Sequence, residues 1–194
     1  MRYSILLLIS LFQFSFAQNS LERLENSPRH HEWVKIETNT NEINSFLVYP
    51  EVSEKVPVVV LIHENRGLND WARSMTDQIA EMGYIAIAPD FLSGTAPNGG
   101  GTNDYQNSDD ARTGIYNLDP AVINDILNKT VDYSKKIASS NGKVVVIGFC
   151  WGGSQSFQFA THSMITSIAN NKNHCVSEVY NFFTFAHSLL NFLH

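Results

Sequence analysis

The sequence predicts an α/β fold with a mostly parallel sheet, helices on both faces and an N-terminal antiparallel hairpin. Three observations support this prediction. Several short apolar runs are continuous, which is typical of strands that are covered on both faces. These runs alternate with stretches of helical length and pattern, which indicates parallel strands joined by crossover helices. Two stretches before the first run alternate at period two, which is typical of a hairpin.

The strands can be placed first. Residues 31–37 and 43–49 form the predicted hairpin, with the turn cluster Asn39-Thr40-Asn41 between them. Residues 57–62 are a continuous apolar run, and residues 84–88 are a second one that ends at a proline. Both are predicted to be buried strands of the parallel part of the sheet.

The first helix and a long loop follow from capping and breaking residues. Asn69 or Asp70 can cap a helix that stops at Gly83. Residues 93–114 are rich in Gly, Asn, Asp, Ser and Thr, so we expect one long loop there.

A second helix precedes the last predicted strand. Asp119 is a good helix cap and Pro120 a good first helical residue. This helix is expected to run to about Ala138, and Asn141-Gly142 should close it. The strand over residues 143–147 comes next.

The end of that strand is the most informative part of the chain. It reads Gly148-Phe149-Cys150-Trp151-Gly152, which fits a nucleophile elbow with cysteine in place of the usual serine. Such a turn from strand to helix is so tight that only glycine fits at its flanking positions. It would expose Cys150 at the edge of the sheet, above a helix N-terminus whose partial positive charge favours a thiolate. The alternative is that Cys150 is a small buried apolar residue.

Two further segments follow buried strands and complete a pattern. They are His63-Glu64-Asn65-Arg66-Gly67 and Ala88-Pro89-Asp90-Phe91. Together with Gly-Phe-Cys-Trp-Gly-Gly at 148–153, in this order and spacing, they resemble the dienelactone hydrolase family. This family, also called carboxymethylenebutenolidases, consists of α/β-hydrolases with a cysteine nucleophile. The resemblance covers roughly residues 30–160, so the fold it implies is an incomplete α/β-hydrolase fold.

The resemblance implies a role for four residues. Cys150 matches the nucleophile that attacks a lactone or ester carbonyl and forms a thioester. Glu64 matches a carboxylate that controls the protonation of the thiol. The backbone N–H groups of Asn65 and Trp151 match the two donors that stabilise the oxyanion.

Neighbouring residues have structural interpretations as well. Glu64 could instead pair with Arg66 or another cation, and Arg66 is expected to hold its loop through an ion pair. His63 is expected to be a partly buried histidine with satisfied nitrogens. Asp90 is expected to cap its loop through backbone hydrogen bonds.

The loop after the Pro-Asp strand bears on the substrate. Family members that act on dienelactone hold its carboxylate with arginine in this loop. Residues 91–98 here contain neither Arg nor Lys. The predicted partner is therefore a small-molecule ester or lactone, and dienelactone itself is not predicted.

The segment after the elbow helix does not match the family. A hydrolase of this fold needs an acid and a histidine after the nucleophile. Residues 161–194 contain no aspartate, Glu178 is their only acid, and His162 lies about 18 Å along the elbow helix. We therefore expect a truncated or frame-shifted member with impaired catalysis, or else a tail that evolved as a cap. The alternative function is a non-catalytic fragment or binding protein that keeps the elbow fold.

The N-terminus predicts export. Residues 1–17 have the pattern of a signal peptide: Arg2 supplies a positive charge and an apolar core follows it. Ser15-Phe16-Ala17 offers small residues for cleavage after Ala17. The expected location is secreted or periplasmic, with no membrane attachment after cleavage. Residues 18–160 are then the N-terminal portion of a hydrolase domain, and residues 161–194 an unmatched tail.

Composition excludes other classes of function. The net charge is −6 and no basic run is present, so no nucleic-acid partner is predicted. The two cysteines have no metal-ligand spacing and form no C-x-x-C motif, so no metal, cofactor or thiol-redox role is predicted. Cys175 is expected to be a small filler, because a disulfide to Cys150 would block the nucleophile.

Overall fold

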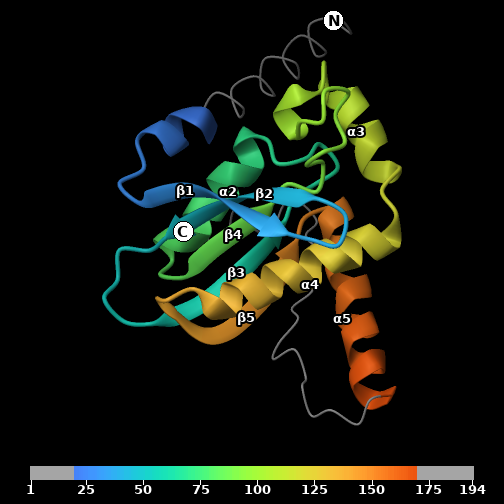
Figure 1. Cartoon of the computed structure of the whole chain (residues 1–194). Coiled ribbons are helices and arrows are strands. Elements are labelled where there is room, and N and C mark those ends of the chain that lie inside the picture. Colours follow the sequence, from blue (N-terminus) through green and yellow to red (C-terminus); the bar gives the residue numbers. More distant parts are fainter. Residues whose placement is uncertain (1–19, 170–194) are drawn as a thin grey trace, which may run out of the picture.

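The computed structural model describes residues 20–169, which form a five-stranded sheet with helices on both faces (Figure 1). A short helical segment over residues 20–25 precedes the sheet. The predicted signal peptide, Cys175, Glu178 and the histidines at 174, 187 and 194 lie outside the described residues. No described helix combines the length and the apolar character that a membrane span requires. The elements are β1 (His30–Glu37), β2 (Glu42–Tyr49), β3 (Val56–Ile62), α2 (Asp70–Glu81), β4 (Ile85–Pro89), η1 (Thr102–Asp104), α3 (Ser108–Tyr116), α4 (Pro120–Lys136), β5 (Ser140–Gly148) and α5 (Trp151–Ala169).

The strand order in the sheet is β1-β2-β4-β3-β5. Strand β3 pairs in parallel with β4 and β5, whereas β2 is antiparallel to both β1 and β4. Every strand except β2 therefore runs in the same direction, and the predicted α/β class with an antiparallel N-terminal hairpin is confirmed. The carboxyl ends of β3, β4 and β5 meet at one edge, where ligands bind in sheets of this type.

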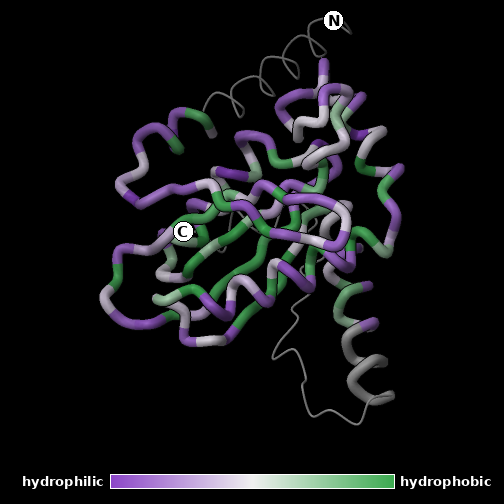
Figure 2. Tube along the Cα trace, in the orientation of Figure 1, coloured by the Kyte–Doolittle hydropathy of each residue, from purple (hydrophilic) through white to green (hydrophobic). Residues whose placement is uncertain are grey.

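Each face of the sheet has its own apolar core. Helix α2 covers one face, and α4 with the start of α5 covers the other (Figure 1). The apolar strands run through the middle of the molecule in Figure 2, as expected for a sheet buried on both sides. Strand β3 alternates between the two cores, with Val58, Val60 and Ile62 facing α4 and Val59 and Leu61 facing α2.

The predicted helix caps are present. Asn69 caps α2 by accepting a hydrogen bond from the N–H of Ala72. Asp119 caps α4 by accepting one from the N–H of Ala121 at 2.8 Å, and Pro120 is the first helical residue. Both caps satisfy N–H groups that the helix itself cannot pair.

Two boundaries differ from the prediction. The segment predicted as one loop over residues 93–114 contains helix α3, because Asn107 caps it by accepting from two backbone N–H groups. Helix α4 ends at Lys136, slightly before the expected Ala138. Asn141-Gly142 lies inside the irregular start of β5, because Ser140 already pairs with Val56 of β3.

The lead-in to β1 is fixed to α2 by a buried carboxylate. Asp77 of α2 accepts hydrogen bonds from Ser27 Oγ at 2.6 Å, from two nitrogens of Arg29 and from His31 Nε2 at 2.8 Å. Burial would raise the pKa of Asp77, but the hydrogen bonds from Arg29, Ser27 and His31 outweigh it and hold the pKa below its ordinary value. The side chain of Arg29 is only 9% exposed, so its charge depends mainly on Asp77 for compensation, with Glu81 at 4.0 Å as a more distant partner.

We expect the substitution Asp77→Asn to lower the free energy of unfolding by about 3 kcal/mol, because it removes the hydrogen-bonded carboxylate of the buried Arg29 guanidinium and leaves only the exposed Glu81 at 4.0 Å. Urea denaturation followed by circular dichroism measures the change. The control is Asp132→Asn on the exposed side of α4, which should change stability by less than about 0.5 kcal/mol. Equal effects of the two variants would contradict this interpretation of the cluster.

Candidate active site

The turn after β5 has the geometry of the predicted elbow. Cys150 has φ 52°, and it is the sole described residue other than glycine with positive φ. A left-handed conformation costs an ordinary L-residue about 1–2 kcal/mol, so the surrounding structure must impose it. The turn is closed by hydrogen bonds from the N–H of Gly152 to Phe149 O at 2.8 Å and from the N–H of Gly153 to Cys150 O at 3.1 Å. The thiol of Cys150 is exposed, so the alternative of a buried filler is wrong.

The flanking glycines are required by close backbone contacts. A Cβ atom at Gly148 would lie 2.0 Å from the carbonyl oxygen of Gly152. A Cβ atom at Gly152 would lie 2.4 Å from the carbonyl oxygen of Ile62 and 2.5 Å from that of His63. Side chains at either position would therefore push α5 away from the ends of β3 and β5.

Strand register brings the Glu64 segment to the level of Cys150. Ile62 pairs with Gly148 in the parallel ladder between β3 and β5, and the N–H of Phe149 donates to Ile62 O at 3.1 Å. Glu64 and Cys150 each follow this matched pair by two residues. The two segments that the sequence predicts to cooperate therefore leave the sheet side by side.

The two predicted oxyanion donors are available. The hydrogen bonds of the described residues use the N–H groups of Gly152, Gly153 and Ser154 in the elbow, and none of them uses that of Trp151 or of Asn65. Trp151 is the first residue of α5, where the backbone N–H has no partner within the helix. Both groups can thus donate to an anion that reaches the carboxyl edge of the sheet.

Glu64 and Arg66 do not pair. Glu64 is half-buried and Arg66 is exposed, and within residues 20–169 neither side chain forms an ion pair or a hydrogen bond. The expected loop-holding ion pair of Arg66 is therefore wrong. The loop is held instead by backbone bonds, such as that from the N–H of Gly67 to Glu64 O. The Glu64 carboxylate is left without a competing cation.

His63 is a structural residue beneath the elbow. It is fully buried, its Nδ1 lies 2.8 Å from Glu64 O, and its Nε2 accepts from the N–H of Phe91 at 3.3 Å. These contacts require the neutral form with the proton on Nδ1. The ring stacks on Trp151 with centroids 5.9 Å apart and meets the edge of Phe91 at 5.3 Å. The expected satisfied histidine is confirmed, although it is more buried than predicted.

Burial lowers the pKa of His63, because the imidazolium would lose its hydration, and the nearby Asp90 charge offsets only part of this effect. A proton on Nε2 would also remove the acceptor that Phe91 N–H needs. His63 is thus held neutral and cannot serve as a base, since both ring nitrogens face backbone groups.

Asp90 organises the loops around the site, as expected. It accepts from the N–H of Leu92 at 3.0 Å, from the N–H of Thr102 at 2.8 Å and from Thr102 Oγ1 at 2.6 Å. Thr102 Oγ1 in turn accepts from the N–H of Leu68 at 2.9 Å. This chain of bonds connects the end of β4 to the turn after β3.

Sequence reasoning missed two residues next to the site. The sequence predicts Thr102 only as part of a long loop, and the structure shows that it links Asp90 to Leu68. Tyr116, the last residue of α3, is 62% exposed and its hydroxyl accepts from Asn65 Nδ2 at 3.2 Å. Neither has a local sequence signal, because each acts on a segment far away in the chain.

The described histidines supply no base for Cys150. His30 and His31 lie on β1, at the opposite edge of the sheet from β5. His162 lies on α5 about 18 Å along the helix axis from the elbow, at 1.5 Å per residue. His63 is engaged on both nitrogens. Within residues 20–169 the elbow therefore presents an exposed cysteine, two backbone N–H groups without a described acceptor and the half-buried Glu64, and no described histidine is placed as the base of a triad.

A strand, a sharp turn with positive φ and a helix at the carboxyl edge of a mostly parallel sheet define the α/β-hydrolase class. Residues 43–170 match the Dienelactone hydrolase family. The chain belongs to this family.

Individual relatives agree with this assignment. The chain is 49% identical over 53 residues to YghX, a hydrolase fragment of Escherichia coli (strain K12), covering 27% of this chain and 45% of that protein. It is 27% identical over 139 residues to a carboxymethylenebutenolidase of Pseudomonas putida, covering 69% of this chain and 57% of that enzyme. The chain thus spans about half the length of these curated relatives.

A solved structure shows the same fold. It is P91, a dienelactone hydrolase-like promiscuous phosphotriesterase from metagenomic libraries, with TM-score 0.57 and 22% sequence identity. The match covers 70% of this chain and 55% of that one.

The elbow predicts a strong effect of a single methyl group. We expect Gly148→Ala to lower the free energy of unfolding by at least about 3 kcal/mol, because the new Cβ would overlap the Gly152 carbonyl. The control is Gly99→Ala, which meets no atom within 4 Å and should cost only about 1 kcal/mol for its positive φ. Thermal and urea denaturation measure both, and equal losses would contradict the tight-turn geometry.

The neutral state of His63 predicts a pH dependence of stability. The folded chain binds fewer protons than the unfolded chain near pH 6, because the pKa of His63 is lowered from 6.5 by burial. The contribution of neutral His63 to the free energy of unfolding is complete above pH 6.5. As the pH falls from 6.5 toward the pKa of His63 in the folded chain, the free energy of unfolding decreases by up to about 1.4 kcal/mol per pH unit.

Urea denaturation between pH 5 and pH 7 measures this slope. His63→Gln should remove it, whereas His30→Gln, at an exposed position, should leave it unchanged. A slope that persists in His63→Gln would show that another group causes it.

Proposed function

We propose that this chain carries the nucleophile half of a hydrolase of lactone or ester bonds, and that it acts through a thioester on Cys150. The observation that carries the proposal is the left-handed, exposed Cys150 in an elbow whose flanking glycines cannot be replaced without collision. Backbone strain of this kind persists where the position of one side chain matters. Family membership supports hydrolysis as the reaction class.

The first half of the reaction needs only residues around the elbow. The Cys150 sulfur forms a bond to the carbonyl carbon, and the electrons of the C=O π bond move to oxygen. The resulting oxyanion accepts hydrogen bonds from the N–H groups of Trp151 and Asn65, which have no other described acceptor. Glu64, which no cation engages, takes the proton of the thiol and returns it to the leaving oxygen as the C–O bond breaks.

The second half of the reaction needs a base that activates water. Water must attack the thioester carbon, the C–S bond must break, and the acid product must leave. A histidine oriented by an acid performs this step in hydrolases of this type. We propose that hydrolysis is slow in this chain, because the described histidines supply no such base.

The substrate class follows from the loop after β4. Residues 91–98 have no cationic side chain, so a substrate carboxylate would find no partner there. We therefore propose an uncharged small-molecule ester or lactone as the substrate. We also propose that the chain is exported through residues 1–17, as the sequence predicts.

A second candidate function is a non-catalytic fragment or binding protein that keeps the elbow fold. Both His63 nitrogens face backbone groups, so His63 cannot act as a base, and this favours the second candidate. Such a chain would bind anions at the elbow without hydrolysing an ester. Acylation of Cys150 separates the two candidates.

The test uses the full chain and p-nitrophenyl acetate. We expect a burst of about one equivalent of p-nitrophenol per chain, followed by slow release, because the thioester forms but is not hydrolysed efficiently. Intact-mass and peptide mass spectrometry should place the acetyl group on Cys150. In Cys150→Ala the burst rate should fall by about a hundredfold.

Two controls sharpen this experiment. Cys150→Ser keeps the turn and a weaker nucleophile, so it should be acylated far more slowly although it folds like the wild type. Iodoacetamide should label Cys150 faster than free cysteine at neutral pH. Absence of any adduct on Cys150 would refute the proposed nucleophile. Brisk multiple turnover that disappears in Cys150→Ala would instead refute the proposed impairment.

A further inference from the structure

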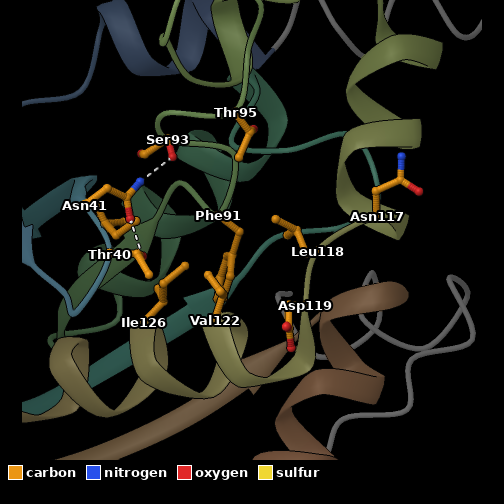
Figure 3. A pocket seen from close by; sticks show the side chains of 11 residues that line it. Thr40, Asn41, Phe91, Ser93, Thr95, Asn117, Leu118, Asp119, Val122 and Ile126 are labelled. Atoms are coloured by element: carbon orange, nitrogen blue, oxygen red, sulfur yellow. Dashed lines mark hydrogen bonds between the residues drawn. The ribbon is translucent and has the colours of Figure 1, made fainter.

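A cavity of about 360 Å³ lies away from the elbow, on the α4 face of the sheet (Figure 3). Three segments far apart in the sequence form it: the β1–β2 turn, the loop after β4, and the residues from the end of α3 into α4. Phe91 separates it from the elbow, since its ring packs edge-on against Trp151 with centroids 5.6 Å apart. The volume is at the lower end of the range for small-molecule sites.

Hydrogen bonds fix the walls of the cavity. Asn41 Nδ2 donates to Ser93 O at 2.7 Å, and the N–H of Asn44 donates to Ser93 Oγ at 3.0 Å, so the β1–β2 turn is attached to the loop after β4. On the other side, Asn39 donates to Asp125 of α4 through its N–H at 2.8 Å and its Nδ2 at 2.7 Å. The turn is thus held between its two neighbours, and the space does not close when it is empty.

The surface of the cavity is partly apolar, and all but one of its lining residues are uncharged. Phe91, Leu118, Val122 and Ile126 line it together with Ile43, as Figure 3 shows for the first four. The short polar side chains of Thr40, Asn41, Ser93 and Thr95 form the remaining wall.

The one charged residue among those that line the cavity is Asp119. Its carboxylate accepts from the N–H of Ala121 and caps α4. An anion placed in the cavity would lose hydration without gaining a cationic partner. A cation could pair only with Asp119, which is exposed to water.

We propose that this cavity is a binding site for an uncharged, mainly apolar small molecule with a single hydroxyl group. The apolar side chains contact its ring or branched body. Its hydroxyl would lie beside Thr40 and Thr95, whose own hydroxyls donate to Asn41 Oδ1 at 3.0 Å and to Leu92 O at 2.7 Å and can each still accept a hydrogen bond. The site is distinct from the elbow and does not require Cys150 chemistry.

The test compares three probes of the same shape with the full-length chain: benzyl alcohol, benzoate and benzylamine. We expect benzyl alcohol to bind with a Kd in the millimolar range, as is usual for about eight non-hydrogen atoms. Benzoate should bind at least about fivefold more weakly, because no lining residue is cationic. Benzylamine should bind no more tightly than benzyl alcohol, because an ion pair with the exposed Asp119 would be weak. Chemical-shift changes in ¹H–¹⁵N spectra measure the affinities and should map to residues 40–43, 91–95 and 117–126.

Filled variants test the location. Val122→Trp and Leu118→Trp each place a ring in the cavity and should weaken benzyl alcohol at least about fivefold. Two changed positions, one in the connection before α4 and one within α4, guard against a fold defect in one of them. The matched control Asn128→Trp adds the same ring on the exposed side of α4 and should leave the Kd within about twofold.

Several results would overturn the proposal. These are no binding of benzyl alcohol at about 20 mM, equal affinity for the three probes, or wild-type affinity in both filled variants. Cys150→Ala should bind like the wild type, and loss of binding there would place the ligand at the elbow instead. Failure of ester hydrolysis has no bearing on these measurements, so the two proposals can fail separately.

Discussion

The structure depends on the close approach of backbone atoms where β5 turns into α5. Without side chains at Gly148 and Gly152, the first turn of the helix can rest against the carbonyl groups of Ile62 and His63. This contact joins the ends of β3 and β5, and it forces Cys150 into a left-handed conformation with its thiol exposed. A strained cysteine is tolerated there because the end of β3 is buried and the ladder between β3 and β5 holds the end of β5 in register.

The layer beneath the elbow supports this turn without taking part in chemistry. His63, Phe91 and Trp151 pack their rings on one another, and His63 stays neutral because both nitrogens face backbone groups. Asp90 performs the corresponding task for the loops, through bonds to backbone N–H groups and Thr102. His63 and Asp90, which are both titratable and lie next to the elbow, therefore have structural roles. The described groups at the elbow without a partner are the Cys150 thiol, the N–H groups of Trp151 and Asn65 and the Glu64 carboxylate, and we propose that they favour formation of a thioester over its hydrolysis.

The fold could be predicted from the sequence wherever the signal is local and strong. The apolar runs of β3 and β4, the Asp119-Pro120 start of α4 and the Gly-Phe-Cys-Trp-Gly turn all have fixed spacings that few other structures use. Helix α3 was missed because its polar composition is that of a loop, and a cap from Asn107 decides its start. The expected ion pair of Arg66 was wrong because proximity in sequence does not set the direction of a side chain in a turn.

By itself, the sequence determined the α/β class, the position of the elbow and the absence of a cation in the loop after the Pro-Asp strand, because these depend on residue type and spacing within short segments. Only the tertiary structure decided that Cys150 is exposed, that Glu64 pairs with no cation of residues 20–169, that Tyr116 contacts Asn65, and that three distant segments line a cavity. Those facts depend on the register between strands and on the packing of loops, which bring together residues that no local pattern connects.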